Sequence, residues 1–105
     1  MPKRNRIRRF SSDEVQGKDS WVEVAQLTVG EIRESREMGM REDFNPFDWG
    51  IQLLSTHVMG WNWVNDAGEP LPQVRDNPDV IEQLSDTEAG FLSTCIKGDQ
   101  EQVKN

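Results

Sequence analysis

The side chains of this sequence best suited to covalent or proton-transfer chemistry are its one histidine, His57, and its one cysteine, Cys95. A thiolate beside an imidazole forms a nucleophile and base, which enzymes orient with a third polar group. No motif places such a group near either residue, and Cys95 falls on the apolar face of a predicted helix, where cysteine packs as a small hydrophobic residue. A lone histidine is more often structural than catalytic. We therefore expect both residues to be structural.

Carboxylates are the next candidates, because the chain has 19 aspartates and glutamates. Paired carboxylates can act as general acid and base, and clusters of them bind divalent cations. Those near predicted helix starts read instead as capping and surface charges: Asp76, Asp79, Glu82, Asp86 and Glu88. Phosphate-binding, dinucleotide-binding, zinc-protease, serine-hydrolase and calcium-loop motifs do not occur, and one histidine with one cysteine cannot complete a zinc site. The sequence predicts a protein that is not an enzyme and uses no cofactor or metal, with a carboxylate site as the alternative.

The net charge of −7 is unevenly distributed along the 105 residues. Residues 1–10 hold five basic side chains and no acidic one, so all 19 acidic side chains follow them. An acidic body repels phosphate backbones, and nucleic acid is therefore not an expected partner except weakly through the basic segment. Because residues 1–20 are otherwise polar, we expect them to form a flexible basic N-terminal arm.

Length and apolar content indicate a single domain with a thin core, since only 34% of residues are hydrophobic. No apolar run approaches the roughly 18 residues of a membrane-spanning helix, and no apolar stretch follows the basic N-terminus as in a signal peptide. A single cysteine forms no internal disulfide. We expect an intracellular domain without a membrane partner.

Local signals predict one short strand and two helices in the first two thirds of the chain. Trp21–Val24 is β-prone. Thr28 and Glu31 form a capping box that opens a polar helix over 29–38, and Asn45 followed by Pro46 starts the next helix. In that helix, apolar residues recur in steps of four and three: Phe47, Ile51, Leu54, Val58 and Trp61. This apolar seam predicts one helix through residue 61 that organises the core.

The C-terminal part begins with a turn at Asn65–Gly68 and a proline-stiffened segment. Asn77-Pro78 starts a further helix, and Ser85 with Glu88 forms a second capping box for a last helix that ends at Gly98. The buried side of this helix is predicted to carry Phe91, Leu92, Cys95 and Ile96. The predicted fold class is mainly α, a bundle of three to four helices over residues 21–98. The arm at 1–20 is expected to be disordered, the tail at 99–105 frayed, and the short strand is an optional element.

Four tryptophans exceed what packing in so small a core requires, and tryptophan is enriched at protein interfaces. Trp61 lies on the apolar seam and is assigned to the core. Trp49 and Trp63 lie off that line, so one of them is a candidate anchor for a partner, with packing in the core as the alternative. The candidate partner-binding residues are Trp49, Trp63, Met59 and Leu53.

The order of these features resembles the tail assembly chaperones of long-tailed bacteriophages. Leu27-Thr28-Val29-Gly30-Glu31 opens a polar helix, as in several such families. A segment ending in Val58-Met59-Gly60-Trp61-Asn62 and then Asp66-Ala67-Gly68-Glu69-Pro70-Leu71-Pro72 follow in the same order. The likeness covers residues 21–97 and leaves out the basic N-terminal segment.

This resemblance implies a non-catalytic holdase that coats the tape-measure protein and recruits tail tube subunits. It further implies action in the host cytoplasm and absence from the mature virion. Self-association is a further candidate interaction of the chain. The alternative function is a small structural virion protein, such as a head–tail connector or minor tail component. A third hypothesis is a nucleic-acid-associated regulator that uses Arg4, Arg6, Arg8 and Arg9.

Overall fold

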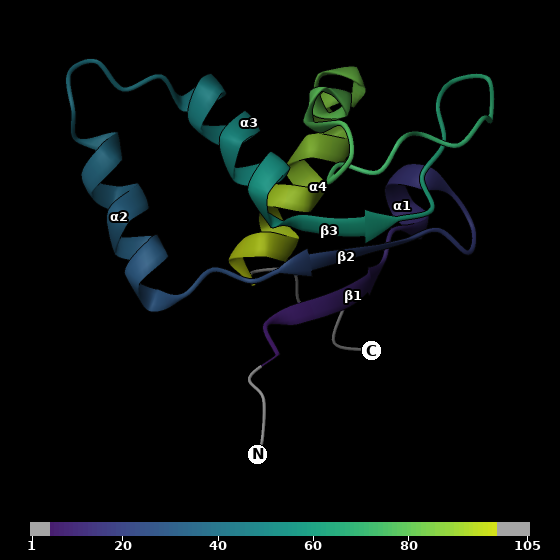
Figure 1. Cartoon of the computed structure of the whole chain (residues 1–105), viewed down its shortest axis with the longest axis horizontal. Coiled ribbons are helices and arrows are strands. Elements are labelled where there is room, and N and C mark those ends of the chain that lie inside the picture. The colour runs from purple at the N-terminus through teal and green to yellow at the C-terminus, as the bar shows by residue number, and fades with distance from the viewer. Residues whose placement is uncertain (1–4, 99–105) are drawn as a thin grey trace.

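The computed structural model describes residues 5–98 and places a three-stranded antiparallel sheet, in the order β1-β2-β3, at their centre (Figure 1). The strands are β1 (Ile7–Ser11), β2 (Trp21–Ala25) and β3 (Val58–Trp61). The helices are α1 (Asp13–Gln16), α2 (Val29–Gly39), α3 (Pro46–His57) and α4 (Asp86–Lys97), with a 3-10 helix η1 (Pro78–Gln83). In the central strand, Val22 lies opposite Phe10 of β1 and opposite Trp61 of β3.

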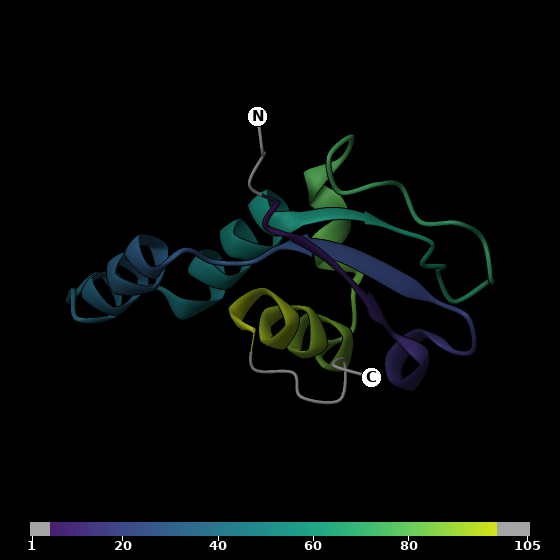
Figure 2. The ribbon, with the colours of Figure 1, turned by 90° about the horizontal axis from the view of Figure 1, so that it is seen from below.

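The predicted mainly α-helical bundle is wrong, because the sheet forms one wall of the core. Val22 and Val24 of β2 are fully buried, and α4 lies along one face of the sheet (Figure 2). Helix α3 packs against α4 and η1 and leads directly into β3. The core joins residues from the strands, α3, η1, α4 and the loop after β3: Phe10, Val22, Val24, Leu53, Leu54, Val58, Trp61, Trp63, Leu71, Val74, Val80, Ile81, Phe91, Leu92, Cys95 and Ile96.

The apolar seam predicted as one helix changes from helix to strand at its fourth member. α3 ends at His57, and Val58 begins β3. Val24 pairs with Val58 but Glu23 pairs with Gly60, so Met59 is an extra residue in a β-bulge. The bulge lets Val58 and Trp61 both face the core although they are three residues apart. A bulged strand therefore reproduced the spacing of a helix, and the helix predicted through residue 61 is corrected to end at 57.

The N-terminal segment predicted as a flexible arm is ordered from residue 5 to residue 20 as β1 and α1. Phe10 is buried opposite Val22, and the guanidinium of Arg9 lies 4.1 Å from the ring centre of Trp21 while pairing with Glu23 at 3.1 Å. Cross-strand contacts of this kind hold a basic strand that composition alone assigns to disorder. The predictions for residues 1–4 and for the tail at 99–105 lie outside the described residues.

The predicted helix caps and helix ends are confirmed. Both capping boxes form, with the Thr28 and Ser85 hydroxyls each accepting a hydrogen bond from the backbone N–H three residues on. Asn45 caps α3 ahead of Pro46, and Gly98 ends α4 in the left-handed region at φ 79°. The predicted strand at Trp21 is β2, whereas the helix predicted after Asn77 is the 3-10 helix η1.

Candidate functional site

Helices α2 and α3 and the loop between them form a helical arm, residues 29–57, that extends away from the sheet (Figure 1). All eleven residues of α2 are described, and none of them is buried. α3, in contrast, buries Leu53, Leu54 and His57 near its end. The arm is therefore fixed to the domain at the α3 end and open along α2.

The arm carries most of the large apolar side chains that the described part of the chain leaves in solvent. Val29, Met40 and Phe47 are exposed to 78%, 84% and 73%, and Ile7 of β1 is the fourth at 42%. Single exposed apolar residues are ordinary on protein surfaces, but a group of them on one projecting element indicates an interaction surface.

Two small hollows separate α2 from α3, and Trp49 and Gln52 line both of them. One, of about 150 Å³, lies toward the base of the arm and includes Leu27 and Leu53. The other, of about 170 Å³, lies toward the tip and includes Met38. Since close-packed helices leave few voids larger than a water molecule, α2 and α3 are not fully packed against each other.

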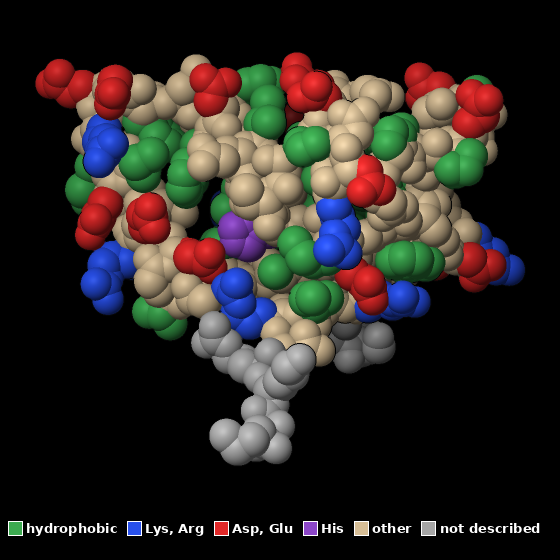
Figure 3. Space-filling model, in the orientation of Figure 1, with side chains coloured by type: hydrophobic (Ala, Val, Ile, Leu, Met, Phe, Trp, Pro, Cys, Tyr) green, Lys and Arg blue, Asp and Glu red, His purple; other side chains and the backbone are tan. Residues whose placement is uncertain are grey.

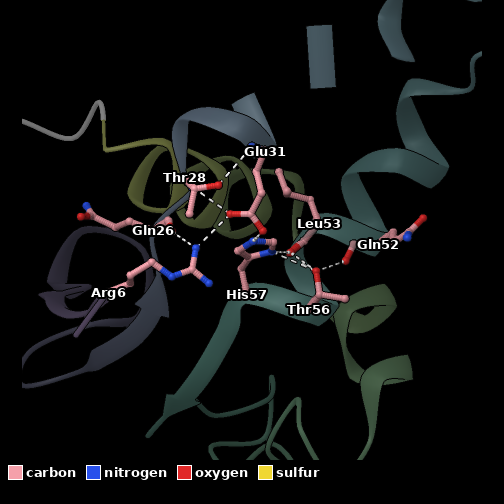
Figure 4. Close-up of polar contacts among 8 residues, drawn as sticks. All are labelled: Arg6, Gln26, Thr28, Glu31, Gln52, Leu53, Thr56 and His57. Atoms are coloured by element: carbon pink, nitrogen blue, oxygen red, sulfur yellow. Dashed lines mark hydrogen bonds and ion pairs between the residues drawn. The ribbon is translucent and has the colours of Figure 1, made fainter. Parts of the chain in front are cut away.

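A polar cluster of Arg6, Glu31 and His57 ties the base of α2 to the domain, and these side chains point toward one another (Figure 4). The Glu31 Oε1 atom accepts hydrogen bonds from the Thr28 backbone N–H at 2.8 Å and from the Arg6 guanidinium at 3.0 Å. Its Oε2 atom lies 3.5 Å from Nε2 of His57. The Thr28 hydrogen bond, and then Arg6 and His57, lower the pKa of Glu31 from 4.5 to about 2, against an opposing effect of burial.

His57 has structural contacts in this cluster. Its Nδ1 atom lies 2.9 Å from the Leu53 carbonyl oxygen, and the Thr56 hydroxyl lies at the same distance from Nδ1. Because a carbonyl oxygen only accepts, the contact with Leu53 is a hydrogen bond when Nδ1 carries a proton. The other ring nitrogen, Nε2, lies toward Glu31. His57 therefore contacts both the last turn of α3, through Leu53, and the first turn of α2, through Glu31.

The other residue singled out for chemistry, Cys95, is fully buried on α4. Burial raises the pKa of its thiol to about 12, so the thiol stays protonated at neutral pH and is a poor nucleophile. Within residues 5–98, no three or more histidine, cysteine, aspartate or glutamate side chains gather where they could hold a metal ion.

The four predicted partner-binding residues have different surroundings. Trp49 is half-buried on the arm and lines the hollow near its base together with Leu53, which is itself buried. Met59 is half-buried and lines a separate hollow of about 530 Å³ where β1, β2 and the base of the arm meet. Trp63 is fully buried, stacks on Trp61 at 4.8 Å and donates to the Ser12 hydroxyl at 2.9 Å. Trp63 and Leu53 therefore both belong to the core, and Leu53 also lines the hollow beside Trp49.

The sequence does not single out two residues of the site, Phe47 and Glu31, as functional. Phe47 was assigned to the apolar seam, but it stands in the first turn of α3, beyond the part of the helix that the core covers. Glu31 was recognised as a capping residue, whereas its contacts with Arg6 and His57 span 25 and 26 residues of sequence. No local pattern identifies partners at that separation.

Comparisons with protein-family models, with curated proteins and with solved structures find no match for this chain. Among residues 5–98, none of the helices has the length and apolar character needed to cross a lipid bilayer.

Proposed function

We propose that this chain is a tail assembly chaperone of a long-tailed bacteriophage, a non-catalytic protein that binds the tape-measure protein and promotes assembly of tail tube subunits. In this proposal it acts in the host cytoplasm and leaves before the virion is complete. The helical arm is the surface that binds the client, with Val29, Met40 and Trp49 as contacts.

The observation that carries the proposal is that α2 is a well-capped helix with nothing buried. Isolated helices shorter than about 12–15 residues are marginal in water, and most helices in proteins are stabilised by packing one apolar face. α2 has eleven residues and leaves its apolar side chains half or fully exposed. A partner that packs on this face would supply the stabilisation that the domain itself does not give.

Charge supports the same role. A protein that presents apolar side chains to clients must itself stay dispersed, and a net charge of −7 opposes association of its own copies. Half-buried Met38 and exposed Met40 lie at the end of α2, and methionine adapts its shape to different apolar partners. The resemblance of residues 21–97 to the chaperone family adds a client class to these physical properties.

Co-expression with the cognate tape-measure protein tests the proposal. The wild-type chain is expected to keep that protein soluble and to elute with it from a sizing column. The double variant Val29→Ser/Met40→Ser should reduce the recovered complex by about tenfold, because it removes exposed contacts from the arm without opening the core. Ile7→Ser is the matched control, since Ile7 is an exposed apolar residue outside the arm.

A tape-measure protein that stays insoluble beside the wild-type chain would contradict the proposal, as would equal recovery with the arm and control variants. Stoichiometric presence of the chain in purified mature particles would instead favour the small structural virion protein.

A further inference from the structure

A second surface of interest is an apolar groove of about 510 Å³ between α3, η1 and α4. The groove is separate from the hollows of the helical arm, because Phe47, Gly50, Ile51 and Leu54 of α3 line the groove. The α3 residues that line the hollows include Trp49, Gln52 and Leu53 instead. Its volume falls within the range of about 300–1,000 Å³ that is usual for binding pockets. We call it the α3–η1–α4 groove.

The walls of the groove have the form of two helical faces. On α3, the lining residues Phe47, Gly50, Ile51 and Leu54 follow the spacing i, i+3, i+4, i+7. On α4, the same spacing is given by Asp86, Ala89, Gly90 and Ser93. Ile81 and Leu84 close the space between them. Such a surface fits the apolar face of a third helix, whose anchors repeat with the same period.

Two glycines in the groove have no purpose in the packing of the domain itself. A Cβ atom added at Gly50 or at Gly90 would meet no atom within 4 Å, and both residues lie inside helices without a positive φ. Glycine weakens a helix interior relative to alanine. The absence of two side chains here therefore leaves room for another backbone to approach α3 and α4 closely.

The charged side chains that line the groove are all acidic. Glu82 and Asp86 line it, and none of its described lining residues is basic. Between residues 42 and 96 the sequence has one arginine, Arg75, and no lysine. Figure 3 shows acidic side chains along the same edge of the molecule, with hydrophobic side chains exposed between them. An acidic rim around an apolar floor attracts a cationic partner and repels nucleic acid and anionic lipid.

We propose that the α3–η1–α4 groove binds a basic amphipathic helix of a partner protein. Apolar side chains of that helix would enter between Phe47, Leu54 and Leu84, its backbone would approach Gly50 and Gly90, and its lysines or arginines would face Glu82 and Asp86. The groove uses residues of α3 other than those that line the hollows between α2 and α3, and the proposal does not depend on the identity of the client.

Nuclear magnetic resonance titration of the full-length ¹⁵N-labelled chain tests this directly. The probe is a synthetic 14-residue amphipathic helix of leucine and lysine, and its control has glutamate in place of lysine. We expect the lysine peptide to shift the amide signals of Gly50, Leu54, Gly90 and Ser93, and the glutamate peptide to leave them in place. No shift with the lysine peptide, or shifts confined to other parts of the chain, would overturn the proposal.

Charge-reversal variants separate the groove from the general acidity of the protein. Glu82→Lys should weaken the peptide affinity about threefold to tenfold. Glu69→Lys changes the net charge equally at an exposed turn away from the groove and should stay within about twofold of wild type. Equal weakening by both variants would mean non-specific attraction and would overturn the proposal.

A glycine variant separates the stability of the chain from its peptide binding, because the two are expected to change in opposite directions. Gly90→Ala should raise the melting temperature, because the added methyl group meets no atom of the chain, and yet weaken peptide binding because it fills the groove. Gly30→Ala on α2 is the matched control and should leave peptide binding unchanged. Peptide affinity that is unaffected by Gly90→Ala would contradict the close approach of a partner backbone.

Discussion

Replacement of Glu31 by glutamine removes the charge at the base of the helical arm while it keeps most of the geometry. Glutamine also serves at this position of a capping box, so the hydrogen bond to the Thr28 backbone N–H can persist. What the variant loses is the carboxylate that faces Arg6 at 3.0 Å and His57 at 3.5 Å. The experiment therefore isolates the electrostatic contribution of Glu31 to the attachment of α2 to the rest of the domain.

The size of the effect follows from the pKa of Glu31. A decrease from 4.5 in the unfolded chain to about 2 in the fold corresponds to an upper limit of roughly 3 kcal/mol at neutral pH. The Thr28 hydrogen bond is the largest cause of this decrease, and glutamine keeps it. Because the side chain is also 36% exposed, solvent screens its ion pairs, and the contribution that the variant loses falls to about 1 kcal/mol. We expect Glu31→Gln to lower the free energy of unfolding at pH 7 by this smaller amount.

The pH dependence has a definite sign. Because the folded pKa lies below the unfolded one, the carboxylate contributes fully above pH 4.5 and loses its contribution as the pH falls from 4.5 toward 2. Urea unfolding of wild type and variant at a series of pH values should show two curves that converge over this interval. Glu34→Gln, an exposed position on the same helix, is the control and should change the unfolding free energy by less than about 0.5 kcal/mol. A difference between wild type and Glu31→Gln that is zero at pH 7, or that does not change with pH, would refute the reasoning.

Three further predictions concern the core and its caps. Trp63→Phe removes the indole donor to the buried Ser12 hydroxyl and part of the ring that stacks on Trp61. It should cost at least about 1–2 kcal/mol of unfolding free energy in urea, and unchanged stability would contradict a contribution from these buried contacts. Ser85→Ala removes the N-cap of α4 and should cost about 1 kcal/mol by the same measurement, with Ser85→Thr as the variant that retains the cap. The Cys95 thiol should resist a water-soluble disulfide reagent at pH 8 in the native chain and react fully in urea; rapid native reaction would contradict its burial.

The sequence predicted those parts of the fold that depend on residues close together in the chain. The capping boxes at Thr28 and Ser85, the Asn45-Pro46 helix start and the Gly98 terminus each involve a few neighbouring residues, and all of them form. Such motifs satisfy backbone groups locally and need no knowledge of the tertiary fold.

The sheet could not be predicted in the same way, because its stability comes from pairing between distant segments. The residues that pair β1 and β3 with β2 lie 10 or more positions apart in the sequence, and the basic composition of β1 hides the one core residue, Phe10, that fixes it. The bulge at Met59 also gives β3 the spacing of a helix. Periodicity alone does not distinguish a bulged strand from a continuing helix.

The candidate site was predicted only in part. Trp49 does lie on the helical arm, but Trp63 stacks on Trp61 inside the core, since its indole N–H has a buried partner in Ser12. An excess of tryptophan indicates that some large side chains serve an interface without indicating which ones. The exposure of Val29 and Met40 follows from the projection of α2 and its C-terminal end from the sheet, which no local pattern in the sequence indicates.

Amide hydrogen exchange along residues 29–39 tests most directly whether α2 is a helix that a partner stabilises. We expect these amides to exchange rapidly in the isolated chain, and at least about tenfold more slowly in the co-expressed complex with the tape-measure protein, while amides of β2 and α4 change little. Slow exchange of α2 in the isolated chain, or equal rates in the two samples, would contradict a client-binding role for the arm.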